Sequence, residues 1–331
     1  CSSDLLYRAE RTRVREMNTR LMKTLEDLTF KDAVDNDVKR ENANIDGDTA
    51  MGTMLKYGSE SAKQFYEMYV LNPRHAKAHR DGDIHIHDLD FLTLTTTCCQ
   101  IDIVKLFKDG FSTGHGFLRE PNDIQSYSAL ACIAIQSNQN DQHGGQSIPN
   151  FDYGMAIGVA KTYSKLYTKN LAKAAEILEG KSDLEESFKE IKRKVYAESG
   201  VKPRLEASEE YCRLEAPYLA EIVGEEAVEK LQKFAVKYSE KETDRATYQA
   251  MEALVHNLNT MHSRAGAQVP FSSINYGTDT TPEGRMVIRN ILLAEDAGLG
   301  NGETPIFPIH IFKVKEGINY NESDPNYDLF K

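Results

Sequence analysis

The sequence predicts an α/β fold in which helices alternate with short apolar strands around a largely parallel sheet or barrel. The C-terminal half carries this prediction most clearly. Thr247–His262 is a weakly charged helical run, and Val269–Tyr276 has the β-branched and aromatic content of a strand. Pro282 stands where a new helix would start, and that helix is expected to end near Gly298. A last strand-like run covers Ile306–Val314.

The first part of the chain is predicted to be helical. Residues 1–40 are polar and rich in Arg, Glu and Asp, with leucines loosely at helical spacing, which indicates a lead-in helix and linker. Asp48 or Thr49 is a candidate N-cap for the next helix, which is expected to continue to about Leu71.

Strand, helix and loop signals follow in the middle of the chain. Ile84–Leu89 is predicted to be a strand, and Thr95–Phe107 is a second apolar segment. Asp123 is expected to cap a helix of small residues from Ser126 to about Ile135. The amide-rich stretch Gln136–Gln146 is predicted to be a polar loop.

Residues 156–262 are predicted to be mostly helical. Their stretch 174–215 is dense in Lys, Glu and Arg, which is typical of solvated helix faces. We therefore expect solvated helices, and no chemistry, from that stretch.

The composition is that of a globular protein with an acidic balance. Of the 331 residues, 40% are apolar and 27% are charged, and the formal net charge is −11. This charge argues against a surface that coats nucleic acid, because binding a polyanion needs clustered Lys and Arg, but it allows a local basic pocket for one nucleotide. No apolar run reaches the length of a membrane span, and the first residues lack the layout of a signal peptide. No membrane partner is expected, and the cytoplasm is the expected location.

The cysteines form an odd set of five without a CxxC pair. We therefore expect neither a disulfide framework nor a thiolate zinc site. Those in helical runs are assigned to the core or the surface. The five are Cys1, Cys98, Cys99, Cys132 and Cys212.

Two adjacent segments concentrate reactive side chains. Asp83–Asp90 contains His85, His87 and several carboxylates, and Thr95–Asp102 adds two neighbouring thiols. Such a density beside β-branched residues favours chemistry over packing. A His-x-His pair can bind a metal, but no third ligand has a clear spacing from it, so no metal site is predicted.

Several segments occur together in the order found in one known family, from about residue 41 onward. Each alone is a weak signal, whereas the ordered set is specific. The segments are Glu41–Asp48, His85–Asp90, Thr96–Asp102, His143–Pro149, Ser263–Phe271, and Phe307–Pro308 with Asp324–Asp328. Through them the chain resembles the class III, oxygen-sensitive ribonucleoside-triphosphate reductases of the glycyl-radical enzyme superfamily.

The resemblance implies both a fold and a reaction. Residues 41–331 would be the first part of the ten-stranded α/β barrel of these enzymes, with the ATP cone and the C-terminal glycyl-radical region absent. The implied reaction is anaerobic reduction of ribonucleoside triphosphates to 2′-deoxyribonucleoside triphosphates by a glycyl and thiyl radical mechanism. ATP and deoxynucleotides would act as allosteric effectors. Because the barrel is incomplete, the chain is expected to be inactive alone and to expose strand edges.

Cofactors and partners are implied in the same way. A separate radical-SAM activating enzyme would generate the glycyl radical. Both this radical and a zinc ion would belong to the missing C-terminal region. Formate or a thioredoxin-like protein would supply electrons, and the protein is expected to form a homodimer.

Cys98 is the expected catalytic thiol, because the resemblance aligns it with the cysteine on the strand that faces the 2′ side of the substrate. Neighbouring strand residues point to opposite faces, so Cys99 is assigned to packing. The alternative is that both are small buried hydrophobic residues. His87 is expected to form a hydrogen bond in the ribose pocket or to orient the loop with Asp88 and Asp90. A purely structural role is its alternative.

Substrate phosphates are expected to contact the segment between the helix ending near residue 262 and the following strand. The candidates are Ser263, Arg264, Gly266 and Gln268. Small residues let backbone N–H groups approach an anion, Arg264 adds charge, and Gln268 can donate its amide. A plain helix-to-strand turn is an equally weighted alternative.

An effector site is expected where the family binds a deoxynucleotide at its dimer interface. Arg119, Gln125 and Gln136 are the candidates, in the stretch 119–125 and the helix after it. Packing explains the Ala and Ser content of that helix equally well.

Two other functions fit the residues. A non-catalytic regulatory protein on the same half-barrel would bind deoxynucleotides through residues 119–136 and dimerise without a radical. A glycyl-radical lyase acting on a small acid fits less well, because those enzymes place adjacent cysteines on the finger loop.

Overall fold

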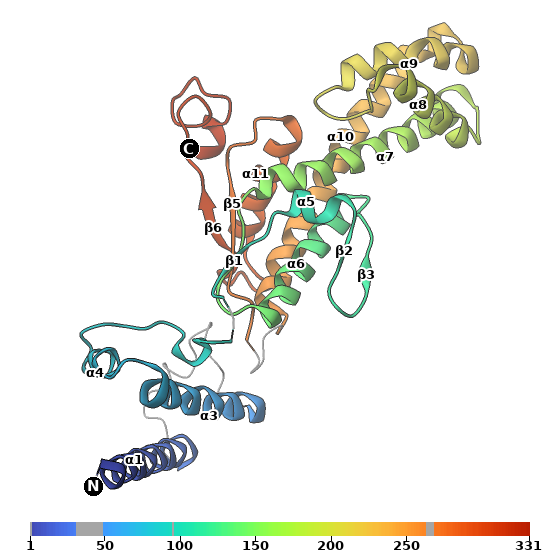
Figure 1. Ribbon diagram of the computed structural model, residues 1–331. Helices are drawn as coiled ribbons and strands as arrows, with labels where there is room; N and C mark the ends of the chain where they lie inside the picture. The colour runs from blue at the N-terminus through green and yellow to red at the C-terminus, as the bar shows by residue number, and fades with distance from the viewer. Residues whose placement is uncertain (1, 31–48, 95, 263–267) are drawn as a thin grey trace. The chain divides into compact units, whose positions relative to one another are not determined.

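The computed structural model describes residues 2–30, 49–94, 96–262 and 268–331 (Figure 1). The chain divides into two compact units. The first is made of Cys1–Cys99, Gln136–Gly145 and Met261–Phe271, and the second of Gln100–Ile135, Gln146–Thr260 and Ser272–Lys331. Each unit is therefore built from segments that are far apart in the sequence.

The described part of the first unit is mainly helical. Its complete elements are α1 (Ser2–Phe30), α3 (Ala50–Phe65), the π-helix η1 (Tyr66–Val70), α4 (Pro73–Asp81) and the short 3-10 helix η2 (Leu89–Phe91). Thr49 caps α3 by accepting the N–H of Gly52, as one of the two predicted caps. Asn72 caps α4, which starts with Pro73 because a helix needs no N–H at its first position. The predicted lead-in helix is confirmed by α1.

A mostly parallel sheet lies at the centre of the fold, and most of its strands belong to the second unit. Within the described residues the strands are β1 (Cys99–Gln100), β4 (Gln146–Ile148), β5 (Ser272–Tyr276) and β6 (Ile309–Phe312), in the order β1-β4-β5-β6. β4 pairs with β5, and β5 with β6, in parallel. The predicted α/β class with parallel strands is confirmed. The described strands form an open sheet, with β1 and β6 at its edges.

Helices make up most of the second unit. They are α5 (Ile103–Lys108), α6 (Ile124–Asp141, which ends in the first unit), α7 (Phe151–Glu179), α8 (Glu185–Ser199), α9 (Ser208–Val223), α10 (Glu225–Thr260), α11 (Pro282–Ala297) and α12 (Tyr327–Phe330). A short antiparallel hairpin is formed by β2 (Phe111–Ser112) and β3 (Phe117–Leu118). The prediction that residues 156–262 are mostly helical is confirmed.

Two long helices connect the sheet with a helical extension. α7 packs against β5, α10 and α11, whereas α8 and α9 lie at the other end of α7 and α10 (Figure 1). The extension has its own apolar core, in which Tyr163, Phe188, Tyr211, Leu219 and Leu231 are fully buried. The sheet end of the second unit and this extension are thus joined by continuous helices.

The turn after β5 is held by one buried carboxylate. Oδ2 of Asp152, in the first turn of α7, accepts the backbone N–H groups of Gly277, Thr278 and Asp279 at 2.9–3.0 Å. Thr281 then caps α11 by accepting the N–H of Gly284. α11 therefore starts at Pro282, as predicted.

The strand predicted over Ile84–Leu89 is wrong, because these residues form turns that lead into η2. Gly82 ends α4 in the left-handed conformation, and Asp88 is also left-handed with φ of 50°. The N–H of Ile86 is donated to Nδ1 of His79 at 3.2 Å instead of to a neighbouring strand. A left-handed residue reverses the chain direction and prevents extended pairing.

Three further segments differ from the prediction or add detail to it. Residues 136–141 continue α6, so the predicted loop Gln136–Gln146 is reduced to a short connection before β4. The segment Thr95–Phe107 contains a short helix, α5, because Asp102 accepts the N–H groups of Val104 and Lys105. The charged stretch 174–215 is helical as expected, but one face of it contributes to the apolar core of the extension.

Among the helices described, none combines the length and apolarity needed to cross a bilayer.

Candidate functional site

The loop that carries Cys98 is built from two separate motifs. The N–H of Cys98 is donated to the carbonyl of His143 at 2.9 Å, and the N–H of Cys99 to that of Gly145 at 3.0 Å. The side-chain amide of Gln142 donates hydrogen bonds from Nε2 to the carbonyl of Cys98 at 3.1 Å and to Oγ1 of Thr96 at 2.8 Å. The Thr-Thr-Cys-Cys and Gln-His-Gly-Gly segments are therefore joined along their backbones.

The third motif meets the same loop through its carboxylate. Oδ1 of Asp88 lies 3.1 Å from Nε2 of His143, and the two side chains are 18% and 17% exposed. Phe91 stacks on the His143 ring with a centroid distance of 3.9 Å and an interplanar angle of 13°. Asp90 is also engaged, because the hydroxyl of Ser59 is donated to its Oδ2 at 2.7 Å. The acidic motif thus orients the side chain of His143, and the backbone carbonyl of the same residue accepts the N–H of Cys98.

Gly144 is required by the close approach of this loop. Its φ is 93°, and a Cβ there would lie 2.8 Å from Cγ2 of Thr97, 2.9 Å from N of Cys98 and 3.0 Å from Sγ of Cys98. The amide of Gln139 is donated to the Gly144 carbonyl at 2.7 Å. A side chain at residue 144 would therefore displace the thiol loop.

Cys98 itself differs from the expected strand geometry. It is exposed, with φ of 64°, and it lies immediately before β1, whereas Cys99 is the first residue of β1 and is half-buried. The assignment of Cys98 to a strand position is therefore wrong, because its left-handed backbone places it in the loop before β1. The opposite-face argument for the two cysteines does not apply to this loop. Cys132 is buried in α6, in agreement with a core role.

The other predicted substrate residues lie in different environments. The His87 side chain is 78% exposed, with Nε2 at 3.4 Å from Oδ2 of Asp88. Gln268 is 5% exposed. Ser263, Arg264 and Gly266 lie outside the described residues. The structure therefore brings Cys98 and His87 to the same Asp88–His143 pair, and no contact joins Gln268 to them among the described interactions.

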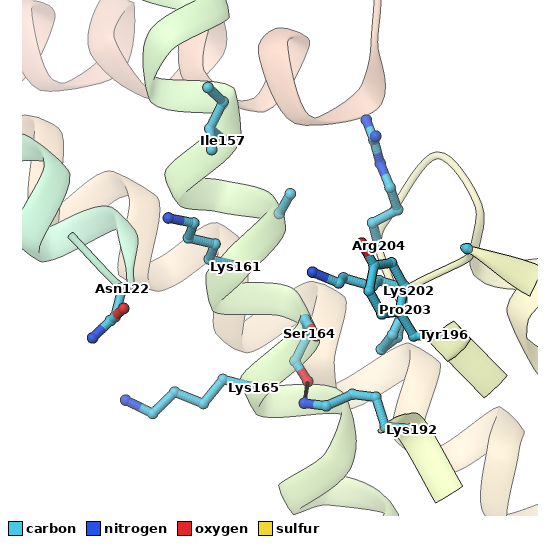
Figure 2. A pocket seen from close by; sticks show the side chains of 12 residues that line it. Asn122, Ile157, Lys161, Ser164, Lys165, Lys192, Tyr196, Lys202, Pro203 and Arg204 are labelled. Carbon is cyan, nitrogen blue, oxygen red and sulfur yellow. Dashed lines mark hydrogen bonds between the residues drawn. The ribbon is translucent and has the colours of Figure 1, made fainter. Parts of the chain in front are cut away.

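A second candidate site is a basic pocket of about 480 Å³ on α7, α8 and the loop after α8 (Figure 2). Its wall on α7 has a four-residue spacing, since Ile157, Lys161 and Lys165 follow one helix face, and Ala160 and Ser164 follow the neighbouring one. The complete lining is Asn122, Ile157, Ala160, Lys161, Ser164, Lys165, Lys192, Tyr196, Gly200, Lys202, Pro203 and Arg204.

The cations of this pocket are only partly neutralised. Lys161 contacts Glu120, and Nζ of Lys165 lies 3.7 Å from Asp123. Burial, and to a smaller extent repulsion from neighbouring cations, lowers the pKa of Lys192. Its Nζ donates a hydrogen bond to the carbonyl of Ser164 at 3.4 Å. In a protein with a net charge of −11, such a concentration of positive charge favours an anionic ligand.

None of the three predicted effector residues lines this pocket. Arg119 and Gln125 are exposed and do not line it, and Gln136 lies in the first unit with a buried Nε2 that has no hydrogen-bond partner among the described residues. Asn122, between the first two, does line it. The lysines of α7 were missed by the sequence reasoning. Their four-residue spacing was a readable signal, but the contribution of Lys192 and Lys202 depends on the folding of α8 against α7.

Comparison with known proteins identifies the family. The sequence model of the anaerobic ribonucleoside-triphosphate reductases matches residues 41–331. The enzyme of that name from Enterobacteria phage T4 is 27% identical over 93% of this chain and 41% of its own length. Those from Salmonella typhimurium strain LT2 and Escherichia coli strain K12 are each 26% identical over 98% of this chain and 37% of their own.

A solved anaerobic ribonucleotide reductase from Thermotoga maritima, in complex with dATP and CTP, aligns with a TM-score of 0.44 and 12% identity. The alignment covers 88% of this chain and 40% of that one. The chain spans about two fifths of the length of the curated relatives named above. Because the family model matches most of its residues, the chain belongs to the anaerobic ribonucleoside-triphosphate reductase family.

Proposed function

We propose that this chain is the first part of the catalytic barrel of a protein that reduces ribonucleoside triphosphates to deoxyribonucleoside triphosphates without oxygen. Family membership supports the reaction class. The observation that carries the site is the meeting of three motifs at Cys98, through Asp88, His143 and Gly144. A thiol held by two independent segments is suited to a fixed position against a sugar.

The reaction removes the 2′ oxygen as water and consumes two electrons, which formate or a thioredoxin-like protein would supply. The glycyl radical, generated by a separate radical-SAM enzyme, would supply the initial hydrogen abstraction. In this proposal the Cys98 thiol faces the 2′ side and gives its hydrogen to the sugar as the 2′ hydroxyl leaves as water, and the external reductant restores the thiol. His87 donates a hydrogen bond to the ribose, and the Asp88–His143 pair keeps the thiol loop in register.

The glycyl radical and the zinc ion of the family would belong to another region of the full-length protein. Among the residues that the structure describes, no group of three or more His, Cys, Asp or Glu side chains could hold a metal ion. The segment with Ser263, Arg264, Gly266 and Gln268 is proposed to contact the substrate phosphates.

The open sheet is proposed to be completed by the rest of the barrel. β6 is an edge strand, and its side chains alternate, with Ile309 and Ile311 41% and 42% exposed. The unpaired backbone groups of such an edge promote pairing with further strands, and the exposed Ile309 and Ile311 lie together on one face of the sheet. The remaining strands would cover this edge.

We further propose that the basic pocket holds the phosphates of a deoxynucleotide or ATP effector. Asn122 places it beside the stretch 119–125, and Lys161, Lys165 and Lys192 supply the charge. This pocket is also the observation that favours the alternative function, a regulatory protein that binds nucleotides without turnover. In either case the protein is proposed to act as a homodimer.

The catalytic proposal is tested by anaerobic turnover of the full-length protein after activation. Cys98→Ser is expected to reduce the turnover number by at least about a thousandfold, because no other thiol occupies its loop position. Cys99→Ser is the matched control and is expected to keep most of the activity. Equal activity of wild type and Cys98→Ser would contradict the proposal.

The effector proposal is tested by calorimetric titration of the 331-residue chain with ATP and each deoxynucleoside triphosphate, with dimerisation followed in parallel. Lys165→Gln is expected to weaken binding about fivefold to fiftyfold. Lys173→Gln, an exposed change on the same helix outside the pocket, is expected to leave binding unchanged. Saturable binding by a protein that never turns over in its full-length form would favour the regulatory alternative.

A further inference from the structure

The wall of the basic pocket is held by a buried carboxylate from a distant element. Glu283, the second residue of α11, is 0% exposed. Its Oε1 accepts Nε–H of Arg204 at 3.2 Å and the backbone N–H of Glu206 at 3.3 Å. A single carboxylate oxygen therefore fixes the loop between α8 and α9 at two points.

The hydrogen-bonding capacity of the Glu283 carboxylate is met mainly by these two donors from the loop. Its second oxygen, Oε2, is buried without a hydrogen-bond partner among the described residues. The N-terminal turn of α11 favours a negative charge, but a buried carboxylate also needs direct donors. Release of the loop would remove the guanidinium and the amide together. The loop and Glu283 therefore stabilise each other's positions.

The same loop carries one side of the pocket. Lys202, Pro203 and Arg204 line it, and Pro203 is buried. Nζ of Lys202 lies over the ring of Tyr196 on α8, 4.2 Å from its centroid. In Figure 2 the Lys202 side chain extends sideways toward α7, whereas the Arg204 side chain extends upward from the loop. Arg204, which anchors the loop on Glu283, is therefore two positions from Lys202 and shares the pocket wall with it.

We propose that Glu283 is a positioning residue for anion binding: through Arg204 and Glu206 it holds Lys202 over the pocket. The ligand class is the polyphosphate of a nucleoside triphosphate, so this inference rests on the effector function proposed above. Glu283 does not line the pocket itself. Its effect on binding acts only through the loop.

The position of Glu283 also links the pocket to the sheet. α11 starts directly after the turn in which Asp152 binds the N–H groups of Gly277, Thr278 and Asp279. Linkage is reciprocal, so a ligand that orders the loop also stabilises the start of α11. Occupation of the pocket is therefore expected to slow hydrogen exchange in residues 283–286.

The sign of one substitution separates positioning from simple electrostatics. Glu283→Gln removes a negative charge near a cationic pocket, so electrostatics alone would strengthen anion binding. If Glu283 positions Lys202, the same substitution weakens it. We expect Glu283→Gln to raise the Kd for inorganic tripolyphosphate about fivefold or more, as Lys202→Met does. The double variant is expected to bind no more than about twofold more weakly than Lys202→Met alone, because both substitutions act on the same contact, that of Lys202 with the anion.

The experiment is a calorimetric titration of the folded 331-residue chain with tripolyphosphate and with each deoxynucleoside triphosphate. Asp244→Asn is the matched control, because Asp244 also pairs with an arginine, Arg289 of α11, but does not touch the pocket loop. It is expected to leave the Kd within twofold. If Glu283→Gln does not fold, Glu283→Asp replaces it, since it keeps the charge outside the pocket but shortens the side chain that reaches Arg204 and Glu206.

The outcomes distinguish the two proposals. A wild-type chain that binds neither tripolyphosphate nor any deoxynucleoside triphosphate overturns the effector site and this inference with it. Wild-type binding that Glu283→Gln or Glu283→Asp leaves unchanged or strengthens overturns only the positioning role. Weaker binding by these variants, with the control unaffected and the double variant not additive, supports it.

Discussion

Oδ1 of Asp88 lies 3.1 Å from Nε2 of His143, which joins two motifs that are far apart in the sequence. The same histidine accepts the N–H of Cys98 through its backbone carbonyl. The Asp88 carboxylate therefore acts on the thiol loop indirectly, because it fixes His143, to which the loop is hydrogen-bonded.

Asp88→Asn is expected to loosen the thiol loop, because a neutral amide replaces the charge-assisted contact with His143. The rate of Cys98 alkylation by iodoacetamide, followed by peptide mass spectrometry, should change at least about twofold, with a loss of about 1 kcal/mol in unfolding free energy. Asp83→Asn, an exposed change in the same segment, is the control and should leave both unchanged. Identical labelling of Cys98 in Asp88→Asn and wild type would disprove this coupling.

Gly144→Ala is expected to displace the thiol loop as well as to strain the backbone. A left-handed alanine costs about 1 kcal/mol, and the added Cβ would also meet Thr97 and Cys98 within 3.0 Å. Gly114→Ala provides the comparison, because Gly114 has a similar φ of 88° with no atom within 4 Å of the added Cβ. Chemical denaturation should show a larger decrease in unfolding free energy for Gly144→Ala than for Gly114→Ala, and only Gly144→Ala should alter the rate of Cys98 alkylation. Equal decreases in unfolding free energy would show that the close contact is unimportant.

Local signals explain which parts of the fold could be predicted from the sequence. Thr49, Asp123 and Pro282 mark helix starts through bonds or dihedral angles set within one turn. The strand content of Val269–Tyr276 was equally local, and β5 lies within it. Parallel order also follows, because the helices between strands leave few other connections.

The errors arose where distant contacts decide the conformation. Ile84–Leu89 has strand-like residues, but Asp88 adopts a left-handed conformation beside His143. Cys98 was assigned to a strand through the resemblance, whereas its left-handed backbone and its bond to His143, which depends on tertiary structure, place it before β1. The basic pocket needs α8 and its following loop to fold against α7, which no local pattern specifies.

Asp152→Asn is expected to destabilise the chain strongly. The buried carboxylate oxygen accepts three backbone N–H groups, so the neutral amide weakens all three, and the unfolding free energy should fall by about 2–4 kcal/mol. Asp324→Asn is the matched control, because Asp324 also accepts three backbone N–H groups but at a more exposed position. Its loss should be below about 1 kcal/mol in the same urea titration. A reversed order would show that burial does not set the strength of these bonds.

Glu215 is a buried acid inside the helical extension, in a stretch whose sequence indicated solvated surface. Its side chain is 1% exposed, and its Oε1 accepts the hydroxyl of Tyr167 and Nε2 of Gln232, the latter at 3.1 Å. Burial raises the pKa of Glu215 from 4.5 to about 7, although the hydrogen bonds from Tyr167, Gln232 and Tyr211 oppose this shift. The protonated form is therefore favoured in the folded state.

The raised pKa of Glu215 predicts that stability decreases as pH rises. Below pH 4.5 the acid is protonated in both states; between pH 4.5 and 7 only the unfolded state gives up its proton, and above pH 7 the folded state must bury the charge. Over this window the contribution to the unfolding free energy should fall by on the order of 3 kcal/mol. Glu215→Gln keeps an oxygen acceptor but cannot ionise, so its stability relative to wild type should increase with pH across the window. Glu209→Gln, an exposed change on the same helix, should show no such trend in urea titrations at pH 4.5, 6 and 8. A difference between Glu215→Gln and wild type that does not vary with pH would mean that Glu215 keeps an ordinary pKa despite its burial.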